Sequence, residues 1–198
     1  MRLLSLKVKK ILIKDKLKKQ EIGIGIKRDM FEDQVKIVYL SIGSNLGYKK
    51  KNIELAKCGI LNENIKIIKS ASNYESLSWP NNNKPKFINT VIKIQTILPP
   101  DILMNKCLKI ESNLGRVRKK KNEPRICDID IIDYDQKIII TKTNEKLIIP
   151  HPHMHKRNFV LLPFFELNKR WIHPVIKKGI KKLIYELNFK ELSTIKII

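Results

Sequence analysis

The sequence has few cysteines and no long apolar run, and these absences narrow the possibilities. Its three cysteines form no C-x-x-C pair. An odd and sparse count argues against a disulfide framework and fits a reducing compartment. No run of 18 apolar residues predicts a membrane span, and the N-terminus lacks the apolar core and small-residue cleavage site of a secretory signal. We therefore expect a cytoplasmic protein that does not act in a membrane.

Arginine and aromatic residues are also scarce. Lysine and arginine total 41, for a net charge of +22, but only seven of these residues are arginines. Such a charge favours polyanionic partners such as nucleic acid, an anionic membrane or nucleotide phosphates. The lysines are scattered through every segment, aromatics make up 7%, and no nucleic-acid-binding motif is present. We expect no specific nucleic-acid partner, and a basic nucleic-acid-binding protein or a metal-dependent nuclease is the alternative.

The length of 198 residues predicts one domain with an appendage. Residues 1–36 are a lysine-rich N-terminal extension of unknown role, and residues 37–198 hold the main domain. Strands are expected over 36–41 and 87–96, helices over 50–62, 99–114 and 175–187, and a loop over 74–86. The glycine-rich turn at 42–47 reads as an ordinary turn, although such turns can also cradle phosphate. Interspersed elements with hairpin spacings predict an α+β fold with a mostly antiparallel sheet.

One stretch combines two opposite charge signatures. Residues 115–130 read GRVRKKKNEPRICDID. In a strand, Asp128 and Asp130 would share a face because side chains two apart point the same way. Two carboxylates on one face repel each other unless a divalent cation lies between them. Magnesium suits this position because it binds through one or two carboxylates together with substrate phosphates.

Three of the seven arginines, Arg116, Arg118 and Arg125, lie in this stretch, and Arg157 follows later in the chain. The planar fork of an arginine suits phosphate oxygens, so we expect these residues to hold phosphates. The alternative is a solvated basic loop before an edge strand. The high density of positive charge in the loop 116–124 predicts that this loop is a lid that closes over a nucleotide.

Four segments together resemble the hydroxymethyldihydropterin pyrophosphokinase family. They are YLSIGSNLG at 39–47, FINTVIKIQT at 87–96, GRVRKKKNEPRICDIDII at 115–132 and IPHPHMHKRNFVLLPFFEL at 149–167. The resemblance implies transfer of pyrophosphate from ATP to the hydroxymethyl group of 6-hydroxymethyl-7,8-dihydropterin, giving AMP, in folate biosynthesis. It also implies a three-layer fold related to ferredoxin-like folds, with helices on both faces of the antiparallel sheet, and a monomer that uses two Mg²⁺ ions.

The resemblance also implies roles for individual residues. Asp128 and Asp130 match the metal ligands. The ATP-binding set is Glu111, Arg116, Arg118, Arg125, His151 and Arg157, of which Arg116, Arg118 and Arg125 are also implied to be catalytic together with the two aspartates. The pterin-binding set is Ser76, Leu77, Trp79, Phe87, Asn89 and Phe159. A zinc site at His151, His153 and His155 is a weaker alternative.

The sequence departs from the family pattern at several positions. The loop is one residue shorter than usual, and Asn122 stands near where a pterin-covering tryptophan is common. Pro152 follows His151, Phe87 replaces a common tyrosine, and Ser76-Leu77 replaces a usual Thr-Pro. These departures bear on loop closure and on backbone contacts to the pterin.

Overall fold

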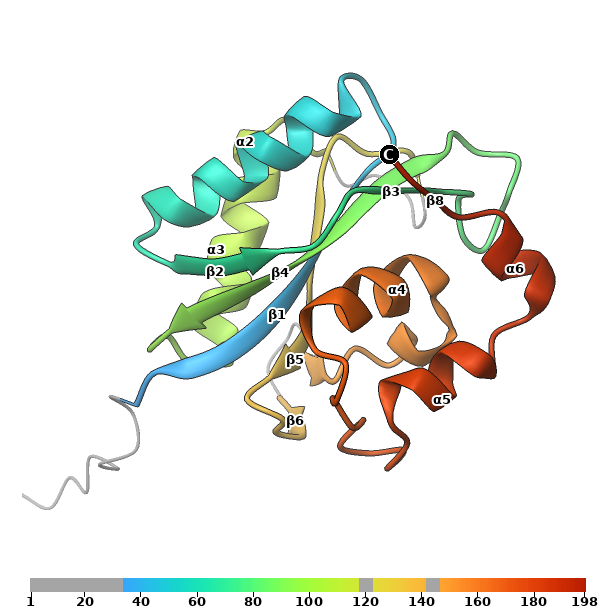
Figure 1. Ribbon diagram of the computed structural model, residues 1–198. Coiled ribbons are helices and arrows are strands. Elements are labelled where there is room, and N and C mark those ends of the chain that lie inside the picture. The colour runs from blue at the N-terminus through green and yellow to red at the C-terminus, as the bar shows by residue number, and fades with distance from the viewer. Residues whose placement is uncertain (1–33, 118–122, 142–146) are drawn as a thin grey trace, which may run out of the picture. The chain divides into compact units, whose positions relative to one another are not determined.

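The computed structural model describes residues 34–117, 123–141 and 147–198 (Figure 1). The expected extension at 1–36 falls almost wholly outside this range, so its boundary stays a prediction. Arg118, Asn122 and most of the expected lid also lie outside the described residues.

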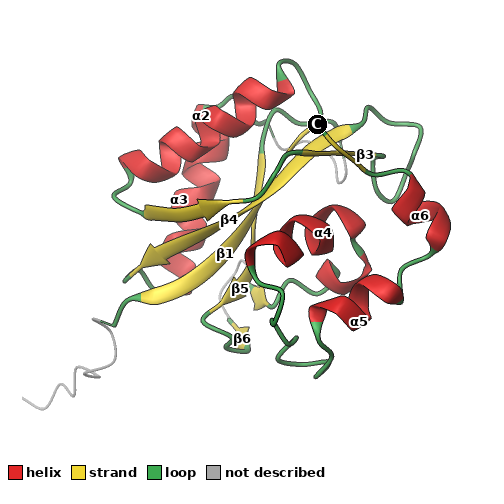
Figure 2. Cartoon of the chain, viewed as in Figure 1, coloured by secondary structure: helices red, strands yellow, loops and turns green. Residues whose placement is uncertain are grey.

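The central sheet is antiparallel throughout, as predicted (Figures 1 and 2). Its strand order is β5-β1-β4-β3-β8, and β2 also pairs with β4. The strands are β1 (Lys36–Ser44), β2 (Lys66–Ser70), β3 (Tyr74–Ser76), β4 (Phe87–Thr96), β5 (Asp128–Tyr134) and β8 (Lys196–Ile197). The two long central strands are rich in β-branched and aromatic residues, which pack well on a pleated, buried surface. A separate two-stranded sheet joins β6 (Ile139–Ile140) to β7 (Ile148–Ile149).

Helices cover both faces of the sheet (Figure 2), which confirms the expected layers. They are α2 (Lys49–Asn62), α3 (Pro100–Asn113), the short 3-10 helix η2 (Met154–Lys156), α4 (Asn158–Leu167), α5 (Ile180–Tyr185) and α6 (Phe189–Ser193). Side chains alternate along β1: Leu40 joins one core with residues of α2 and α3, whereas Tyr39 joins a second core with Leu161 and Phe164 of α4. The two faces of the sheet are therefore sealed by different helices.

A β-bulge changes the alternation in β5. Tyr39 pairs with Asp133 and Leu40 with Ile131, so Ile132 is the extra residue. A bulge shifts the side-chain parity beyond it. Asp133 consequently accepts a hydrogen bond from the indole of Trp171 at 3.1 Å, within the second core.

Two expected elements are wrong. The segment 74–86 is not all loop, because β3 pairs with β4 at Tyr74–Ser76. The expected helix over 175–187 is shortened to α5. Lys177 has a left-handed φ of 59°, and its N–H donates to the carbonyl of His173 at 2.8 Å in a tight turn. A helix therefore cannot begin before this turn ends.

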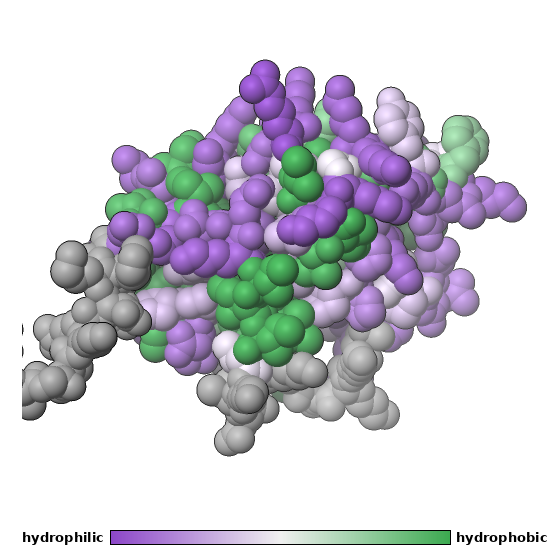
Figure 3. Space-filling view, turned by 90° about the horizontal axis from the view of Figure 1, so that it is seen from below, coloured by the Kyte–Doolittle hydropathy of each residue, from purple (hydrophilic) through white to green (hydrophobic). Residues whose placement is uncertain are grey.

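The surface in the view of Figure 3 is mostly hydrophilic, with several apolar areas of which the largest lies near the lower centre. Exposed apolar residues include Ile138 and Ile140, which are 56% and 62% accessible. Within the described ranges, no helix has the length and apolar character needed to cross a bilayer.

Candidate active site

Both aspartates of β5 lie on the sheet face that α4 covers. Asp128 pairs with Gly43 and Asp130 with Ser41 across the β1–β5 ladder, while Ile129 between them enters the opposite core. The expected shared face is therefore present. The two carboxylates line a small hollow of about 40 Å³. Its other lining residues are Ser41, Gly43, Ser76, Trp79, Phe87, Asn89, Arg125, Arg157 and Phe159.

The two carboxylates have different electrostatic environments. Asp128 accepts hydrogen bonds from Arg116 Nη1 and Arg125 Nη2. Burial alone would raise the pKa of Asp128, but Arg125 and Arg116 outweigh it and hold the pKa below its usual value. Burial and the neighbouring Asp128 instead raise the pKa of Asp130 to about 7. Arg157 does not offset this rise in the pKa, because its Nη1 lies 3.5 Å from Asp130 Oδ2.

The difference between the pKa values of Asp128 and Asp130 indicates whether the site fits a magnesium ion. The carboxylates supply hard oxygen donors on one face, and the repulsion that disfavours the charged Asp130 is what a divalent cation would remove. Among the described residues, no group of three His, Cys, Asp or Glu side chains is arranged to hold a metal. The two carboxylates fit an ion that completes its coordination with phosphate oxygens and water, as Mg²⁺ does.

Glu111 lies behind β5 rather than in the hollow. Its side chain, which is 2% accessible, comes from the last turn of α3. Glu111 Oε1 accepts a hydrogen bond from the N–H of Ile129 at 2.7 Å and lies 2.8 Å from Arg116 Nη1. The residue thus ties α3, β5 and Arg116 together, a supporting position that the sequence did not indicate.

Arginines connect the acidic end of the hollow to its aromatic end. The guanidinium carbon of Arg125 lies 5.2 Å from the centre of the Phe87 ring. That of Arg157 lies 5.1 Å from the Trp79 ring and 5.8 Å from the Phe159 ring. These distances are within the range of cation–π attraction. The same two arginines therefore touch both the carboxylates and the expected pterin-stacking rings.

An amide is fixed between the aromatic rings and the carboxylates. Asn89 is buried, and its Nδ2 donates to Ser76 Oγ at 2.9 Å. Gly43 lies opposite Asn89 in the β1–β4 register. A Cβ atom on Gly43 would come within 2.7 Å of Asn89 Oδ1, so only glycine leaves the amide where it is.

The histidine cluster divides between two neighbourhoods. His151 Nδ1 accepts the N–H of His153 at 3.1 Å, and its Nε2 lies 3.5 Å from Arg157 Nη1. Burial and then Arg157 lower the pKa of His151 to about 4, so its ring is neutral and carries its proton on Nε2. His155 instead packs near His173, with ring centres 6.1 Å apart, so the three histidines of the zinc alternative do not converge.

Asn45 is a site residue that sequence reasoning missed. Its Oδ1 accepts the N–H of Arg125 at 2.7 Å, and its own N–H donates to the Arg125 carbonyl at 3.1 Å. Asn45 Nδ2 also donates to the carbonyl of Pro85 at 3.2 Å. The glycine-rich turn 42–47 was the available signal, but its role in fixing Arg125 depends on a contact 80 residues away.

Leu77 is the one expected pterin-binding residue that lines a neighbouring cavity instead of the hollow.

Comparisons with known proteins agree on one family. Residues 39–169 match the family model described as 7,8-dihydro-6-hydroxymethylpterin-pyrophosphokinase. The chain is 38% identical over 159 residues to the 2-amino-4-hydroxy-6-hydroxymethyldihydropteridine pyrophosphokinase of Aquifex aeolicus, covering 80% of this chain and 93% of that protein. It is 41% identical over 138 residues to the folic acid synthesis protein fol1 of Pneumocystis carinii, covering 70% of this chain but only 18% of that longer protein.

The fold is also similar to solved structures. A crystal structure of Plasmodium falciparum HPPK-DHPS, with pterin and p-hydroxybenzoate, superposes with a TM-score of 0.67 at 14% identity. The match covers 86% of this chain and 49% of that one. At this identity the likeness concerns the fold alone.

Proposed function

Because the chain belongs to the 7,8-dihydro-6-hydroxymethylpterin-pyrophosphokinase family, we propose that it transfers pyrophosphate from ATP to 6-hydroxymethyl-7,8-dihydropterin. The acceptor is the hydroxymethyl group, and the products are AMP and the pterin diphosphate, an activated precursor in folate biosynthesis. One observation supports this most: a single hollow has paired carboxylates at one end, aromatic rings at the other, and arginines that contact both.

Asp128 and Asp130 would hold magnesium, and we propose two ions as in the family resemblance. Bound there, magnesium would neutralise the phosphates and lower the pKa of the pterin hydroxyl. The protein's own contribution is to keep both carboxylates on one rigid strand. Attack on a phosphorus atom needs mainly alignment and charge neutralisation, and a strand supplies the alignment better than a loop does.

The arginines would bind the ATP phosphates. Arg116 and Arg125 contact Asp128, so phosphates that arrive with a cation can exchange for the carboxylate as their partner. Glu111 would keep Arg116 oriented during this exchange, because its contact with Arg116 is independent of Asp128. His151, with its proton on Nε2, would donate to a phosphate oxygen beside Arg157. Arg118 stays a predicted phosphate ligand.

The aromatic end would bind the pterin. Phe87 and Phe159 would stack on the flat ring in place of the arginines, and Asn89 would hydrogen-bond its amide-like edge. The bond from Asn89 to Ser76 orients this amide. Trp79 would close one side of this pterin site, which we call the slot and which comprises Ser76, Trp79, Phe87, Asn89 and Phe159. All of these residues come from one chain, so a monomer suffices, and the cysteine usage supports a cytoplasmic location.

Release of AMP tests the proposal against its rivals. The purified chain is incubated with ATP, Mg²⁺ and 6-hydroxymethyl-7,8-dihydropterin, and AMP is quantified by chromatography. We expect AMP only when all three are present, and none with Asp130→Asn. Cleavage of RNA or DNA with Mg²⁺ and no pterin-dependent AMP would favour the nuclease alternative. Salt-dependent binding to RNA without either activity would favour the nucleic-acid-binding alternative.

A further inference from the structure

The last eleven residues form a segment that we call the C-terminal clip, residues 188–198. It lies beyond residues 39–169, which the family model matches. Its strand β8 pairs with β3, with Tyr74 opposite Ile197 and Glu75 opposite Lys196. The N–H of Ile198 also donates to the carbonyl of Asn73 at 3.0 Å. Figure 1 shows this end of the chain returning to the sheet beside β3.

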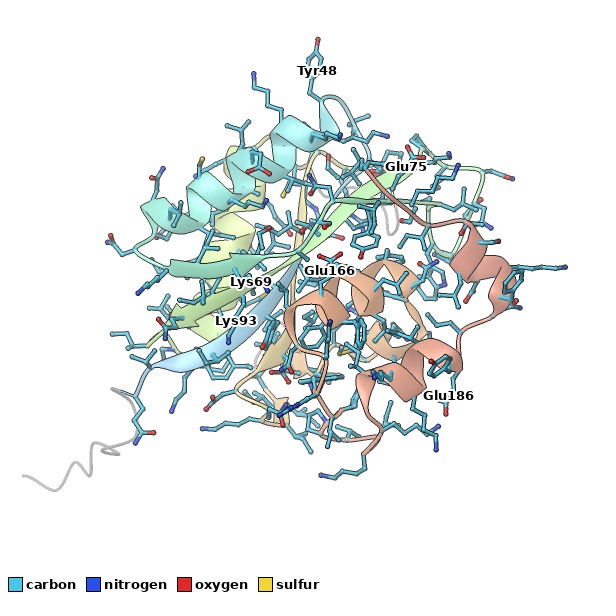
Figure 4. The ribbon with its side chains drawn as sticks, in the orientation of Figure 1. Tyr48, Lys69, Glu75, Lys93, Glu166 and Glu186 are labelled. Carbon is cyan, nitrogen blue, oxygen red and sulfur yellow. The ribbon has the colours of Figure 1, made fainter. Side chains whose placement is uncertain are left out.

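Strand β3 needs such support. It has three residues, and its last residue is Ser76, which contacts Asn89 in the hollow. A very short strand gains little from one ladder, and β8 supplies a second. On the other side, Glu166 of α4 accepts hydrogen bonds from the Tyr74 hydroxyl and, at 2.9 Å, from the N–H of Ser72. Figure 4 shows Glu166 between α4 and the sheet, and Glu75 near the end of the chain.

A second link joins the clip to α4. Asn158 is the first residue of α4 and is 9% accessible. Its Nδ2 donates to the carbonyl of Glu191 in the clip at 2.6 Å. The next residue along the chain is Phe159, which lines the hollow. The clip therefore contacts both elements that carry the slot: β3 directly, and α4 through Asn158.

A cavity of about 190 Å³ separates the clip from the slot. On the slot side it is lined by Leu77, Trp79 and Phe159, and on the clip side by Lys190, Glu191 and Thr194. Trp79 and Phe159 therefore border open space on the clip side, although Phe159 also packs against the second core. Phe159 is the second residue of α4 and Trp79 follows β3 by three residues, so the positions of both depend on elements that the clip joins.

We propose that the C-terminal clip positions β3, Trp79 and Phe159, and so sets the affinity of the protein for the pterin rather than for ATP. Asn158 is the positioning residue that transmits this effect. It lines the cavity behind Phe159 and not the hollow itself. This inference rests on the proposed function for the identity of the ligand, but the position of Trp79 can be measured without it.

The kinetic test compares Asn158→Ala with Asn168→Ala. Asn168 follows the same helix at its other end, and its side chain is also hydrogen-bonded, to the hydroxyl of Tyr39 at 3.2 Å. A net hydrogen bond of ~0.5–1.5 kcal/mol corresponds to about a 2- to 12-fold change in an equilibrium constant. We expect Asn158→Ala to raise the KM for pterin by that factor while kcat and the KM for ATP change less than about two-fold. Asn168→Ala should leave all three near wild type. A parallel change in both KM values would overturn the inference.

The second test needs no activity. The protein has two tryptophans, so labelling with 5-fluorotryptophan gives two ¹⁹F resonances, and Trp79→Phe assigns them. Asn158→Ala, and a chain ending at Leu187, should shift or broaden the Trp79 resonance and leave that of Trp171 in place. Asn168→Ala should leave the Trp79 resonance in place, because the Asn168 side chain donates to the hydroxyl of Tyr39 and not to the clip. If the Trp79 resonance does not move in Asn158→Ala, the inference that the clip positions Trp79 is overturned. Wild-type protein that releases no AMP overturns the proposed function instead.

Discussion

Replacing the two aspartates of β5 one at a time should separate their roles. We expect Asp128→Asn and Asp130→Asn both to abolish AMP release, since each would lose a metal-ligating charge. Their effects on stability in the absence of Mg²⁺ and nucleotide should differ in size and direction. Asp128→Asn should destabilise the protein, whereas Asp130→Asn should be neutral or stabilising.

The magnitudes follow from the contacts. Asp128 has two charge-assisted hydrogen bonds, to Arg116 and Arg125, and such bonds contribute ~1.5–3 kcal/mol each. Asparagine keeps one acceptor oxygen, and relief of the repulsion with Asp130 offsets part of the loss. We therefore expect a net loss of about 2–4 kcal/mol, or about 5–12 °C in Tm for a domain of this size.

Substitution of Asp130 should cost much less stability than substitution of Asp128. Its one ion pair within the described residues, to Arg157, is 3.5 Å long, and its side chain is 31% accessible. Burial and Asp128 both oppose its charge. A neutral asparagine of the same shape removes that opposition, so we expect a change between about zero and a gain of ~1 kcal/mol.

Thermal unfolding in chelator-treated buffer near pH 8 measures this difference. Asp101→Asn is a matched control, because it removes one negative charge from an exposed position in the first turn of α3. The reasoning is refuted if Asp130→Asn lowers Tm as much as Asp128→Asn does. It is also refuted if either variant retains near-normal turnover at saturating Mg²⁺.

Three further predictions concern other residues. Phe159→Ala should weaken pterin binding far more than ATP binding, because stacking adds ~0.5–1.5 kcal/mol beyond buried area; calorimetric titration with each ligand would show equal losses if the change only impaired folding. Gly43→Ala should raise the KM for pterin with little change in Tm, because the new Cβ would lie 2.7 Å from Asn89 Oδ1; unchanged pterin kinetics would mean that this amide does not contact the ligand. Asp133→Asn should become relatively more stable than wild type as pH rises. Burial raises the pKa of Asp133 from 3.8 to about 6. The protonated carboxyl therefore contributes its full stability to the wild-type fold below the unfolded pKa, and this contribution is lost as pH rises through 6. The advantage of asparagine should therefore grow from pH 4 to pH 8 by on the order of 2–3 kcal/mol, and an advantage that stays constant across this range in urea unfolding would contradict the assignment.

Local periodicity was enough to predict much of the fold. The strand 87–96 has the predicted bounds because β-branched residues occupy most of its positions and prolines lie near both of its ends. The shared face of Asp128 and Asp130 follows from the two-residue repeat of any strand. The α+β class and the antiparallel sheet followed from the order and spacing of the elements. Each of these features depends on neighbours in sequence, which the sequence displays directly.

The tertiary structure decided which partners the site residues have. The pairing of Asp128 with two arginines, the place of Glu111 behind β5, and the bond from Asn45 to Arg125 all join residues 3 to 80 positions apart. No periodicity encodes such contacts. The expected terminal helix is shorter because the lysine-rich segment favours a helix locally, but the His173–Lys178 turn and the bridge between Ile172 and Gly179 hold residues 172–179 in another path. Long-range hydrogen bonds override local propensity wherever they satisfy backbone groups that a local helix would leave against the core.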